Sequence, residues 1–320
     1  MKPIVEVSHL CKYFKTPRGQ LHAVEDLSFS IPERTTLGVV GESGCGKSTL
    51  GRVIMGLHDA TSGTLCFEGE DVTKPDKAKK RALNKAVQMI FQDPYSSLDP
   101  RMCVSDLIAE PMKAMKLYPS KAERDQRVAE LMDTVGLARR FAFSYPHELD
   151  GGRSQRIGIA RALSVDPKFI VCDEPVSALD VSIQAQILNL LQDLQDQRGL
   201  TYLFITHNLS VVKHISHSIL VMYLGSEVEL CDSKELFKRP LHPYTKGLLS
   251  AIPIPSIHVQ REEIIMSGEV TSPINPKPGC RFASRCPYAK DKCREALPQV
   301  EEVLPGHFCA CHYVREINQL

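Results

Sequence analysis

The sequence predicts an α/β protein with a core sheet, followed by a small module rich in loops and cysteines. Three observations lead to this prediction. An apolar strand pattern at residues 36–40 runs into a glycine-rich loop and then into a helical pattern at residues 50–57. Two further buried strand patterns, residues 169–172 and 202–205, each end in polar residues suited to a ligand site. From Pro240 onward, prolines interrupt the regular patterns.

The composition is that of an ordinary globular protein. The 320 residues are 43% hydrophobic and 24% charged, and their net charge of +1 gives no reason to expect nucleic acid as a partner. No run approaches the ~18 uninterrupted apolar residues of a membrane span. The N-terminal stretch carries Glu6 and has no long apolar region, so no signal peptide is predicted and we expect a cytoplasmic chain.

The first elements read as a hairpin. Residues 4–10 alternate apolar and polar side chains, a Pro/Gly turn follows, and residues 21–31 read as a second strand. An aromatic side chain in this hairpin can stack on a purine base. Phe14 is the favoured candidate and Tyr13 the alternative, and an ordinary packing role in the sheet stays open for both.

The loop after the strand at residues 36–40 has the spacing G-x-x-x-x-G-K-[ST] of a phosphate-binding loop. Its glycines let backbone N–H groups turn toward an anion, and the following helix adds the positive end of its dipole. Lys47 is expected on the β- and γ-phosphates and the Ser48 hydroxyl on Mg²⁺. The chain is therefore predicted to bind a nucleoside triphosphate. The loop residues are Gly41, Glu42, Ser43, Gly44, Cys45, Gly46, Lys47, Ser48 and Thr49.

The rest of the chain continues the alternation of strands and helices. Residues 71–85 are charged and read as a loop or an exposed helix. Two adjacent helical patterns indicate a helical insert between two parts of a nucleotide-binding core. The patterns place strands at residues 64–68, 87–91, 169–172, 202–205, 219–223 and 227–230, and helices at residues 103–117, 121–135, 153–164, 180–197 and from 233 onward.

Several polar residues follow these elements in a distinctive order. They are Gln92, the run Leu149-Asp150-Gly151-Gly152-Arg153, the pair Asp173-Glu174, then Asp180 and His207. With the loop at residues 41–49, this ordered set resembles the ATP-binding subunit of an ABC transporter over about residues 4–232. The resemblance implies a RecA-like core sheet, an antiparallel β subdomain and a helical subdomain at about residues 93–165. It also implies a nucleotide-binding domain of residues 1–239 and a C-terminal domain of residues 240–320.

The resemblance also assigns roles around bound ATP. Asp173 is expected to hold the Mg²⁺ shell, and Glu174 to act as the general base that orients the attacking water. Gln92 is expected to touch metal and water and to sense the membrane partner. His207 is expected on the γ-phosphate, and Asp180 to communicate across a dimer. These roles suit phosphoryl transfer, which depends on positioning and charge neutralisation more than on covalent chemistry.

One segment departs from the family pattern. The usual signature is Leu-Ser-Gly-Gly-Gln, whereas this chain has Asp150 in place of the serine and Arg153 in place of the glutamine. The usual serine donates to the γ-phosphate held by the other subunit, but an aspartate there repels phosphate unless it is paired, for example with Arg153. We therefore hypothesise an asymmetric dimer in which the site built from Gly151, Gly152 and a partner's phosphate loop is weak or silent.

Two stretches narrow the resemblance to the oligopeptide/dipeptide/nickel importers, and within them to the F-type ATPase of the D/F pair. These stretches are residues 91–100, FQDPYSSLDP, and residues 241–253, LHPYTKGLLSAIP. The resemblance implies a D-type partner ATPase, two transmembrane permeases, an extracytoplasmic solute-binding protein, and a peripheral place on the cytoplasmic face of the membrane. A nickel or metal-chelate importer is the alternative. A soluble ABC ATPase without transport is disfavoured because the chain has one cassette and no heptad run.

Eleven cysteines are many for a cytosolic chain, and five of them lie in the last segment. A reducing compartment argues against a disulfide framework. In the family, the tail cysteines correspond to Cys280, Cys286, Cys293 and Cys311, and some members hold a 4Fe–4S cluster there. Zinc is the alternative, and reduced or disulfide-bonded cysteines are a third possibility. Cys309 takes a place that the family usually fills with an apolar residue.

Overall fold

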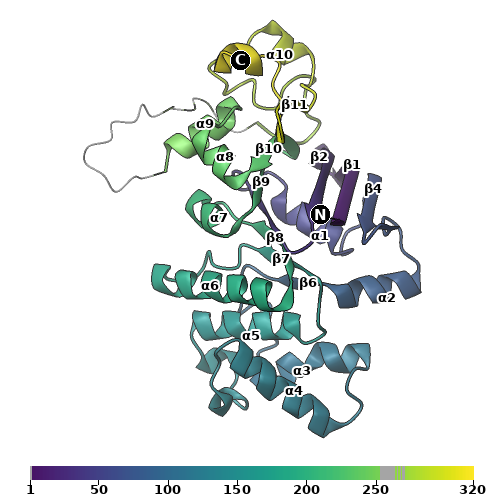
Figure 1. Ribbon diagram of the computed structural model, residues 1–320. Helices are drawn as coiled ribbons and strands as arrows, with labels where there is room; N and C mark the ends of the chain where they lie inside the picture. The colour runs from purple at the N-terminus through teal and green to yellow at the C-terminus, as the bar shows by residue number, and fades with distance from the viewer. Residues whose placement is uncertain (1, 253–263, 265, 267, 269–270) are drawn as a thin grey trace.

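An eight-stranded sheet forms the centre of the molecule, as the computed structural model shows (Figure 1). The structure describes residues 2–252, 264, 266, 268 and 271–320. The strand order is β11-β12-β10-β9-β3-β8-β7-β6. Five neighbouring strands, β9 to β6 in this order, pair in parallel, and the other three pair antiparallel. The strands are β3 (Thr36–Val40), β6 (Val87–Ile90), β7 (Phe169–Asp173), β8 (Thr201–Ile205), β9 (Ser218–Tyr223), β10 (Ser226–Asp232), β11 (Glu301–Leu304) and β12 (His307–Cys309).

The central parallel strands are buried on both faces. Every residue of β3, β7 and β8 is buried, as expected for parallel strands covered on two sides. Alternate side chains enter two different hydrophobic cores: Phe169 and Val171 face one, and Ile170 and Cys172 face the other. This explains why the sequence shows continuous apolar runs here and no alternation.

A second, four-stranded antiparallel sheet has the order β2-β1-β4-β5 and shares one of these cores. Its strands are β1 (Pro3–Thr16), β2 (Gly19–Pro32), β4 (Ser62–Phe67) and β5 (Glu70–Asp71). The helix α1 (Lys47–Ile54) contributes Leu50, Val53 and Ile54 to the same core. The N-terminal hairpin predicted from the sequence is thus confirmed, and it is longer at both strands than predicted.

The helices α3, α4, α5 and α6 gather at one end of the molecule, opposite the C-terminal residues (Figure 1). A capping box formed by Ser120 and Glu123 starts α4, and Val128, Leu131 and Met132 form its buried face. Of these, α3, α4 and α5 lie in the predicted helical insert at about residues 93–165 and confirm it, and α2 shows that the charged segment before β6 is in part helical. The helices are α2 (Lys77–Ala86), α3 (Val104–Met115), α4 (Lys121–Thr134), α5 (Gly151–Leu163), α6 (Val181–Arg198), α7 (Leu209–Ile215), α8 (Ser233–Lys238) and α9 (Pro243–Ser250), with short 3₁₀ turns η1 (Arg139–Phe141) and η2 (Pro146–Glu148).

The C-terminal residues do not form a separate layer, because β12 pairs with β10 and extends the main sheet. Two short helices, α10 (Asp291–Glu295) and α11 (Val314–Asn318), flank the β11–β12 hairpin. Sequence patterns did not predict these strands, since three or four residues carry too little periodicity. Residues 253–263 belong to the predicted C-terminal domain and lie outside the described residues.

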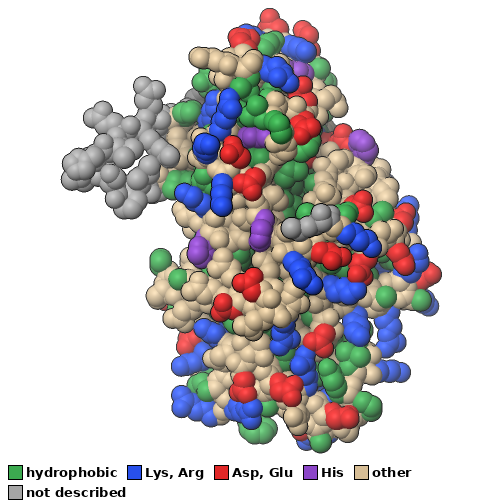
Figure 2. Space-filling view, viewed as in Figure 1, with side chains coloured by type: hydrophobic (Ala, Val, Ile, Leu, Met, Phe, Trp, Pro, Cys, Tyr) green, Lys and Arg blue, Asp and Glu red, His purple; other side chains and the backbone are tan. Residues whose placement is uncertain are grey.

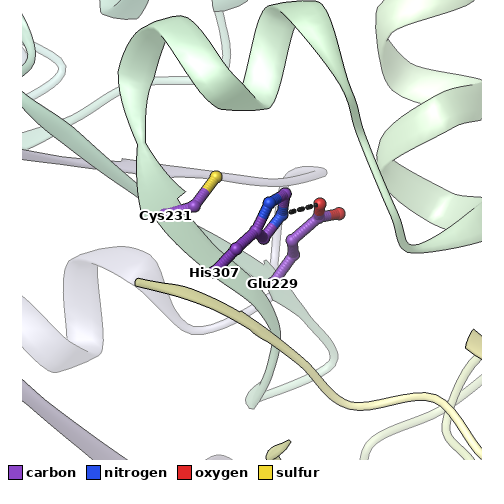
Figure 3. Close-up of side chains that lie close together, drawn as sticks. All are labelled: Glu229, Cys231 and His307. Carbon is purple, nitrogen blue, oxygen red and sulfur yellow. Dashed lines mark hydrogen bonds and ion pairs between the residues drawn. The ribbon is translucent and has the colours of Figure 1, made fainter. Parts of the chain in front are cut away.

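Glu229 fixes this attachment from inside the sheet (Figure 3). Its fully buried carboxylate accepts hydrogen bonds from the backbone N–H groups of Leu241 and His242, at 2.7 and 2.9 Å. His307 Nε2 on β12 lies 2.7 Å from the same carboxylate. This one buried side chain therefore joins β10, the start of α9 and the C-terminal hairpin, so losing a partner would remove a buried hydrogen bond and weaken the attachment.

Lysine and arginine side chains are interspersed with aspartate and glutamate over the face of the molecule in Figure 2. This distribution agrees with the near-neutral net charge of +1. Within the part of the chain that the structure describes, no helix has both the length and the apolar character needed to cross a membrane.

Glu227 predicts a pH dependence of stability. Burial raises the pKa of this carboxyl from 4.5 to about 8, and its two oxygens have no hydrogen-bond partner among the described residues. Between these values the unfolded chain ionises Glu227 while the folded protein keeps it neutral, so stability falls as pH rises through that window. We expect Glu227→Gln to unfold with a free energy higher by ~1–3 kcal/mol at about pH 7.5, and equal to wild type near pH 4.5.

Urea unfolding of the full chain at the two pH values measures this effect. Glu301→Gln, at an exposed position on β11, is the matched control and should show no such gain. An equal gain for Glu227→Gln at both pH values would mean that ionisation of Glu227 is not the cause.

Candidate nucleotide-binding site

The loop between β3 and α1 passes very close to other backbone segments. Gly46 has φ 102°, and a Cβ atom there would lie 2.0 Å from the carbonyl oxygen of Ala23 on β2. A Cβ atom on Gly41 would lie 2.2 Å from the carbonyl oxygen of Met222 on β9. Only glycine fits both positions, because real Cβ atoms do not approach backbone so closely. These two contacts hold the loop against β2 and β9 at the point where α1 begins.

The side chain of Lys47 folds back onto the loop and binds its backbone. This side chain is buried, and Nζ donates to the carbonyl oxygens of Gly41 at 2.8 Å and Glu42 at 2.9 Å. The ammonium group is therefore held among backbone dipoles at the start of a helix, where an anion is favoured. The next residue, Ser48, donates from Oγ to Asp173 Oδ1 at 2.7 Å. Two of the three residues predicted for Mg²⁺, Ser48 and Asp173, thus lie in direct contact, and burial raises the pKa of Asp173.

Glu174 follows β7 and lies between two other predicted site residues. Gln92 Nε2 donates to its Oε2 at 2.9 Å, and His207 Nδ1 lies 3.1 Å from its Oε1. The backbone of Glu174 has φ 47°, an uncommon conformation for a residue with a side chain. Its N–H donates to the carbonyl of Ile205 on β8, at 2.9 Å. The neighbouring strand and two side chains therefore fix the direction of this carboxylate.

These residues line one cavity. The loop and the residues after β6, β7 and β8 all face it, together with residues of the N-terminal hairpin. Donors, a buried cation and a carboxylate meet in this cavity, which suits a magnesium-bound triphosphate. The lining residues are Phe14, Leu21, Ala23, Ser43, Gly44, Gly46, Lys47, Ser48, Thr49, Gln92, Glu174 and His207.

Phe14 and Tyr13 have different surroundings. Phe14 lines the cavity, with Lys12 Nζ 4.8 Å from its ring centroid. The Tyr13 hydroxyl donates to Glu25 at 2.7 Å, and its ring stacks on His22 with centroids 4.1 Å apart. Phe14 is therefore the aromatic residue of the cavity, and Tyr13 belongs to a polar cluster beside it.

The signature segment does not line this cavity. Asp150 is the N-cap of α5, where its Oδ1 accepts from the backbone N–H of Arg153 at 2.8 Å. Its Oδ2 lies 3.0 Å from Arg153 Nη1, and both side chains are exposed. Gly152 packs so closely that a Cβ atom would lie 2.7 Å from Ile183 on α6. Asp180 is the N-cap of α6, and Leu149 is buried. The pairing of Asp150 with Arg153 that the sequence suggested is present.

The tail cysteines divide into two groups, and all eleven cysteines of the chain are free thiols. Each pair among Cys280, Cys286, Cys293 and Cys311 is close enough for charge on one thiol to disfavour ionisation of another. Burial, the larger effect, raises the pKa of Cys280 to about 12 and that of Cys311 to about 11. Cys309 instead interacts with Glu229 and Cys231, as well as with Cys311.

Sequence reasoning missed two arginines of the tail, one of which contacts the phosphate-binding loop and the other the N-terminal hairpin. Arg285 Nη1 lies 3.0 and 2.8 Å from the two carboxylate oxygens of Glu42, in the phosphate-binding loop. Arg281 Nη2 donates to Glu25 Oε2 at 2.8 Å, on the N-terminal hairpin. The partners are more than 240 positions apart in the chain, so no local pattern could indicate them. The one hint in the sequence was the presence of two arginines, Arg281 and Arg285, between Cys280 and Cys286.

Comparisons with known proteins agree with this geometry. Residues 24–177 match the family described as ABC transporter, and residues 228–293 match the family described as oligopeptide/dipeptide transporter, C-terminal region. The putative oligopeptide transport ATP-binding protein YkfD of Bacillus subtilis is 52% identical over 98% of this chain and 96% of its own. The oligopeptide transport ATP-binding protein OppF of Bacillus subtilis is 52% identical over 96% of each chain.

Solved structures give the same result for the fold. A dimeric post-hydrolysis state of the ATP-binding cassette MJ0796 bound to ADP and Pi superposes with a TM-score of 0.66. Its sequence is 26% identical, and the match covers 72% of this chain and 98% of that one. The protein cbiO1 from Clostridium perfringens, part of the ABC transporter complex cbiONQ, matches 75% of this chain and 92% of its own with the same TM-score.

The parallel sheet, the phosphate-binding loop and the acidic pair after β7 define a P-loop ATPase of the ATP-binding cassette class. The chain belongs to the ABC transporter family, among the ATP-binding subunits that carry the oligopeptide/dipeptide transporter C-terminal region. The α/β fold predicted from the sequence, with its core sheet, antiparallel sheet and helical insert, is confirmed.

Proposed function

We propose that this chain is the ATPase subunit that powers an importer of di- and oligopeptides from the cytoplasmic face of the membrane. In this proposal it works with a D-type ATPase, two permeases and an extracytoplasmic solute-binding protein. ATP closes the ATPase dimer, and hydrolysis with product release reopens it. The main support is the Glu174 carboxylate, which faces the phosphate-binding cavity beside Gln92 and His207 in a chain that resembles oligopeptide transport ATP-binding proteins over nearly its full length.

The proposal gives each residue around the cavity a role that its position supports. The backbone N–H groups of the loop and Lys47 bind the β- and γ-phosphates of ATP. Ser48, Asp173 and Gln92 would hold Mg²⁺, which neutralises phosphate charge when bound, and their hydroxyl, carboxylate and amide oxygens are the donors this ion prefers. Glu174 orients a water and accepts its proton as the water attacks the γ-phosphorus. His207 steadies the γ-phosphate, and Phe14 stacks on the adenine.

Uptake measurements test this function. In a strain that lacks the chain but keeps its transport partners, wild type should restore uptake of labelled dipeptides and oligopeptides. Glu174→Gln should bind ATP but lower its hydrolysis by at least ~100-fold, because the amide cannot accept a proton from water. Uptake of nickel but not peptide would assign the alternative cargo. A wild-type protein that stays soluble and never co-fractionates with permeases would contradict a transport role.

We also propose that the chain works in a heterodimer with unequal ATP sites. Asp150 caps α5 as well as serine does, so the exchange keeps the helix but replaces a hydroxyl donor by a carboxylate acceptor. Its pairing with Arg153 reduces the negative charge without supplying the donor. The composite site formed by Gly151 and Gly152 with the partner's loop would be weak. The site formed by Lys47 and Glu174 would depend on a regular signature in the partner.

Replacement of Asp150 tests this asymmetry. Asp150→Ser keeps an N-cap and restores the donor, so we expect the full complex to hydrolyse ATP roughly 3–10 times faster. Asp150→Asn, which removes the charge and keeps a cap, should give a smaller rise. Steady-state hydrolysis by the purified complex is the measurement, and unchanged turnover for Asp150→Ser would refute a limiting role for this position.

We propose further that Cys280, Cys286, Cys293 and Cys311 hold a 4Fe–4S cluster, because four thiolates are its usual ligand set. A single tetrahedral zinc ion would bring thiolate sulfurs to about 3.8 Å from one another. Among the described residues, the group with three ligand atoms within 4.8 Å of one another is Glu229, Cys231 and His307. No such group among the described residues contains three of the four thiols, so they do not form a preassembled site for one tetrahedral zinc ion.

Metal analysis of protein purified without oxygen tests this. We expect about four irons and four acid-labile sulfides per chain, with a broad absorption band near 400 nm. Cys293→Ser should lose most of the iron, whereas Cys309→Ser should keep it. Zinc without sulfide would assign the alternative metal, and iron that depends equally on Cys309 would contradict the proposed ligand set.

A further inference from the structure

Arg285 ties the cysteine-rich tail to the phosphate-binding loop. It lies between Cys280 and Cys286, directly before Cys286. Its guanidinium meets both oxygens of Glu42 at 3.0 and 2.8 Å, and its side chain is only 8% exposed. The Glu42 side chain is 26% exposed, so the pair is partly buried, and breaking it would leave the buried Arg285 guanidinium without this partner.

Glu42 is also held through its backbone. Its N–H donates to the hydroxyl of Tyr244 on α9, at 2.9 Å. Its carbonyl oxygen accepts from Lys47 Nζ at 2.9 Å. One residue of the phosphate-binding loop is therefore bound by the C-terminal residues on its side chain and N–H, and by the phosphate-binding lysine on its carbonyl.

The segment that carries Arg285 is firmly seated. Phe282, in the same segment, is buried with its ring edge-on to Tyr223 at 5.2 Å and beside Tyr244 at 5.4 Å. Tyr223 ends β9, one residue after Met222, whose carbonyl oxygen packs against Gly41 of the loop, and the Tyr223 hydroxyl lies 3.5 Å from Arg285 Nη1. Because these rings are close-packed, a displacement of the segment that carries Phe282 and Arg285 would also displace Tyr244 or Glu42.

We propose that Arg285 is a positioning residue that couples metal loading at Cys280, Cys286, Cys293 and Cys311 to ATP binding at the phosphate-binding loop. Metal ligation at Cys280 and Cys286 fixes both ends of the segment and so sets where Arg285 holds Glu42. The coupling is reciprocal: bound ATP strengthens metal retention by the same factor as bound metal strengthens ATP affinity. This inference rests on the proposed metal site but not on the identity of the transported cargo.

Binding of a fluorescent ATP analogue to the full chain, with Mg²⁺, measures the first half of this coupling. We expect Arg285→Gln to weaken binding by about five- to twentyfold. Arg285→Lys, which keeps the charge on a shorter side chain, should recover part of the loss, because one nitrogen, Nη1, makes both contacts to Glu42. Arg281→Gln is the matched control, because Arg281 has a similarly buried ion pair in the same segment but contacts Glu25 on the hairpin. Its ATP affinity should stay within about twofold of wild type.

A double-mutant cycle and a metal-stripped sample separate coupling from a general loss of structure. Glu42→Gln combined with Arg285→Gln should bind ATP no more weakly than the worse single variant, because both break the same link. Stripping iron with a chelator should weaken ATP binding by wild type and leave Arg285→Gln almost unchanged. Excess ATP should slow iron loss from wild type but not from Arg285→Gln.

Two outcomes would overturn the inference: wild-type ATP affinity in Arg285→Gln, or stripping that weakens wild type and Arg285→Gln equally. Thermal unfolding of each variant identifies any that fail to fold. If Arg285→Gln does not fold, ATP binding by Glu42→Gln, with and without iron, takes its place in the comparison with wild type. Failure of peptide uptake by wild type would reject the proposed cargo and leave these binding results intact.

Discussion

The site depends on a single constraint of parallel sheets: the carboxyl ends of neighbouring parallel strands meet at one edge. The order β3-β8-β7-β6 places the phosphate-binding loop, Thr206-His207, Asp173-Glu174 and Gln92 in succession along that edge. Residues up to 166 positions apart in the chain thus become neighbours without any dedicated contact to bring them together. The hydrogen bonds around Glu174 refine positions that the strand pairing has already set.

Helix capping explains how the signature segment departs from its family without disturbing the fold. The position of Asp150 must supply an oxygen to the free N–H groups at the start of α5, and aspartate does this as well as serine. Steric packing is a separate requirement: Gly152 lies so close to Ile183 that a residue with a side chain would not fit there. The fold therefore constrains this segment only in part, because it requires the glycine at position 152 and a capping oxygen at position 150 but accepts either serine or aspartate as the source of that oxygen.

Much of this architecture was predictable because its signals are local. The strand at 36–40, the loop spacing and the continuous apolar runs of β7 and β8 each lie within a dozen residues. The choice between Phe14 and Tyr13 was harder, since several register shifts in the pairing of β1 with β2, the last between Lys12 and Tyr13, break the alternation that would show which face each side chain occupies. The links from Arg285 to Glu42 and from β12 to β10 were beyond reach, because contacts between distant segments leave no periodic trace in either one.

The pairing of β12 with β10 has a consequence for synthesis of the chain. Without the β11–β12 hairpin, β10 would be the outer strand of the sheet, with unpaired backbone groups that can template aggregation. β12 begins about 75 residues after β10 ends, so at ordinary ribosomal rates that edge stays open for roughly 4–15 s on each nascent chain. Chaperone binding to nascent chains would be most useful in this interval, and pairing of the β11–β12 hairpin with β10 brings the exposure to an end.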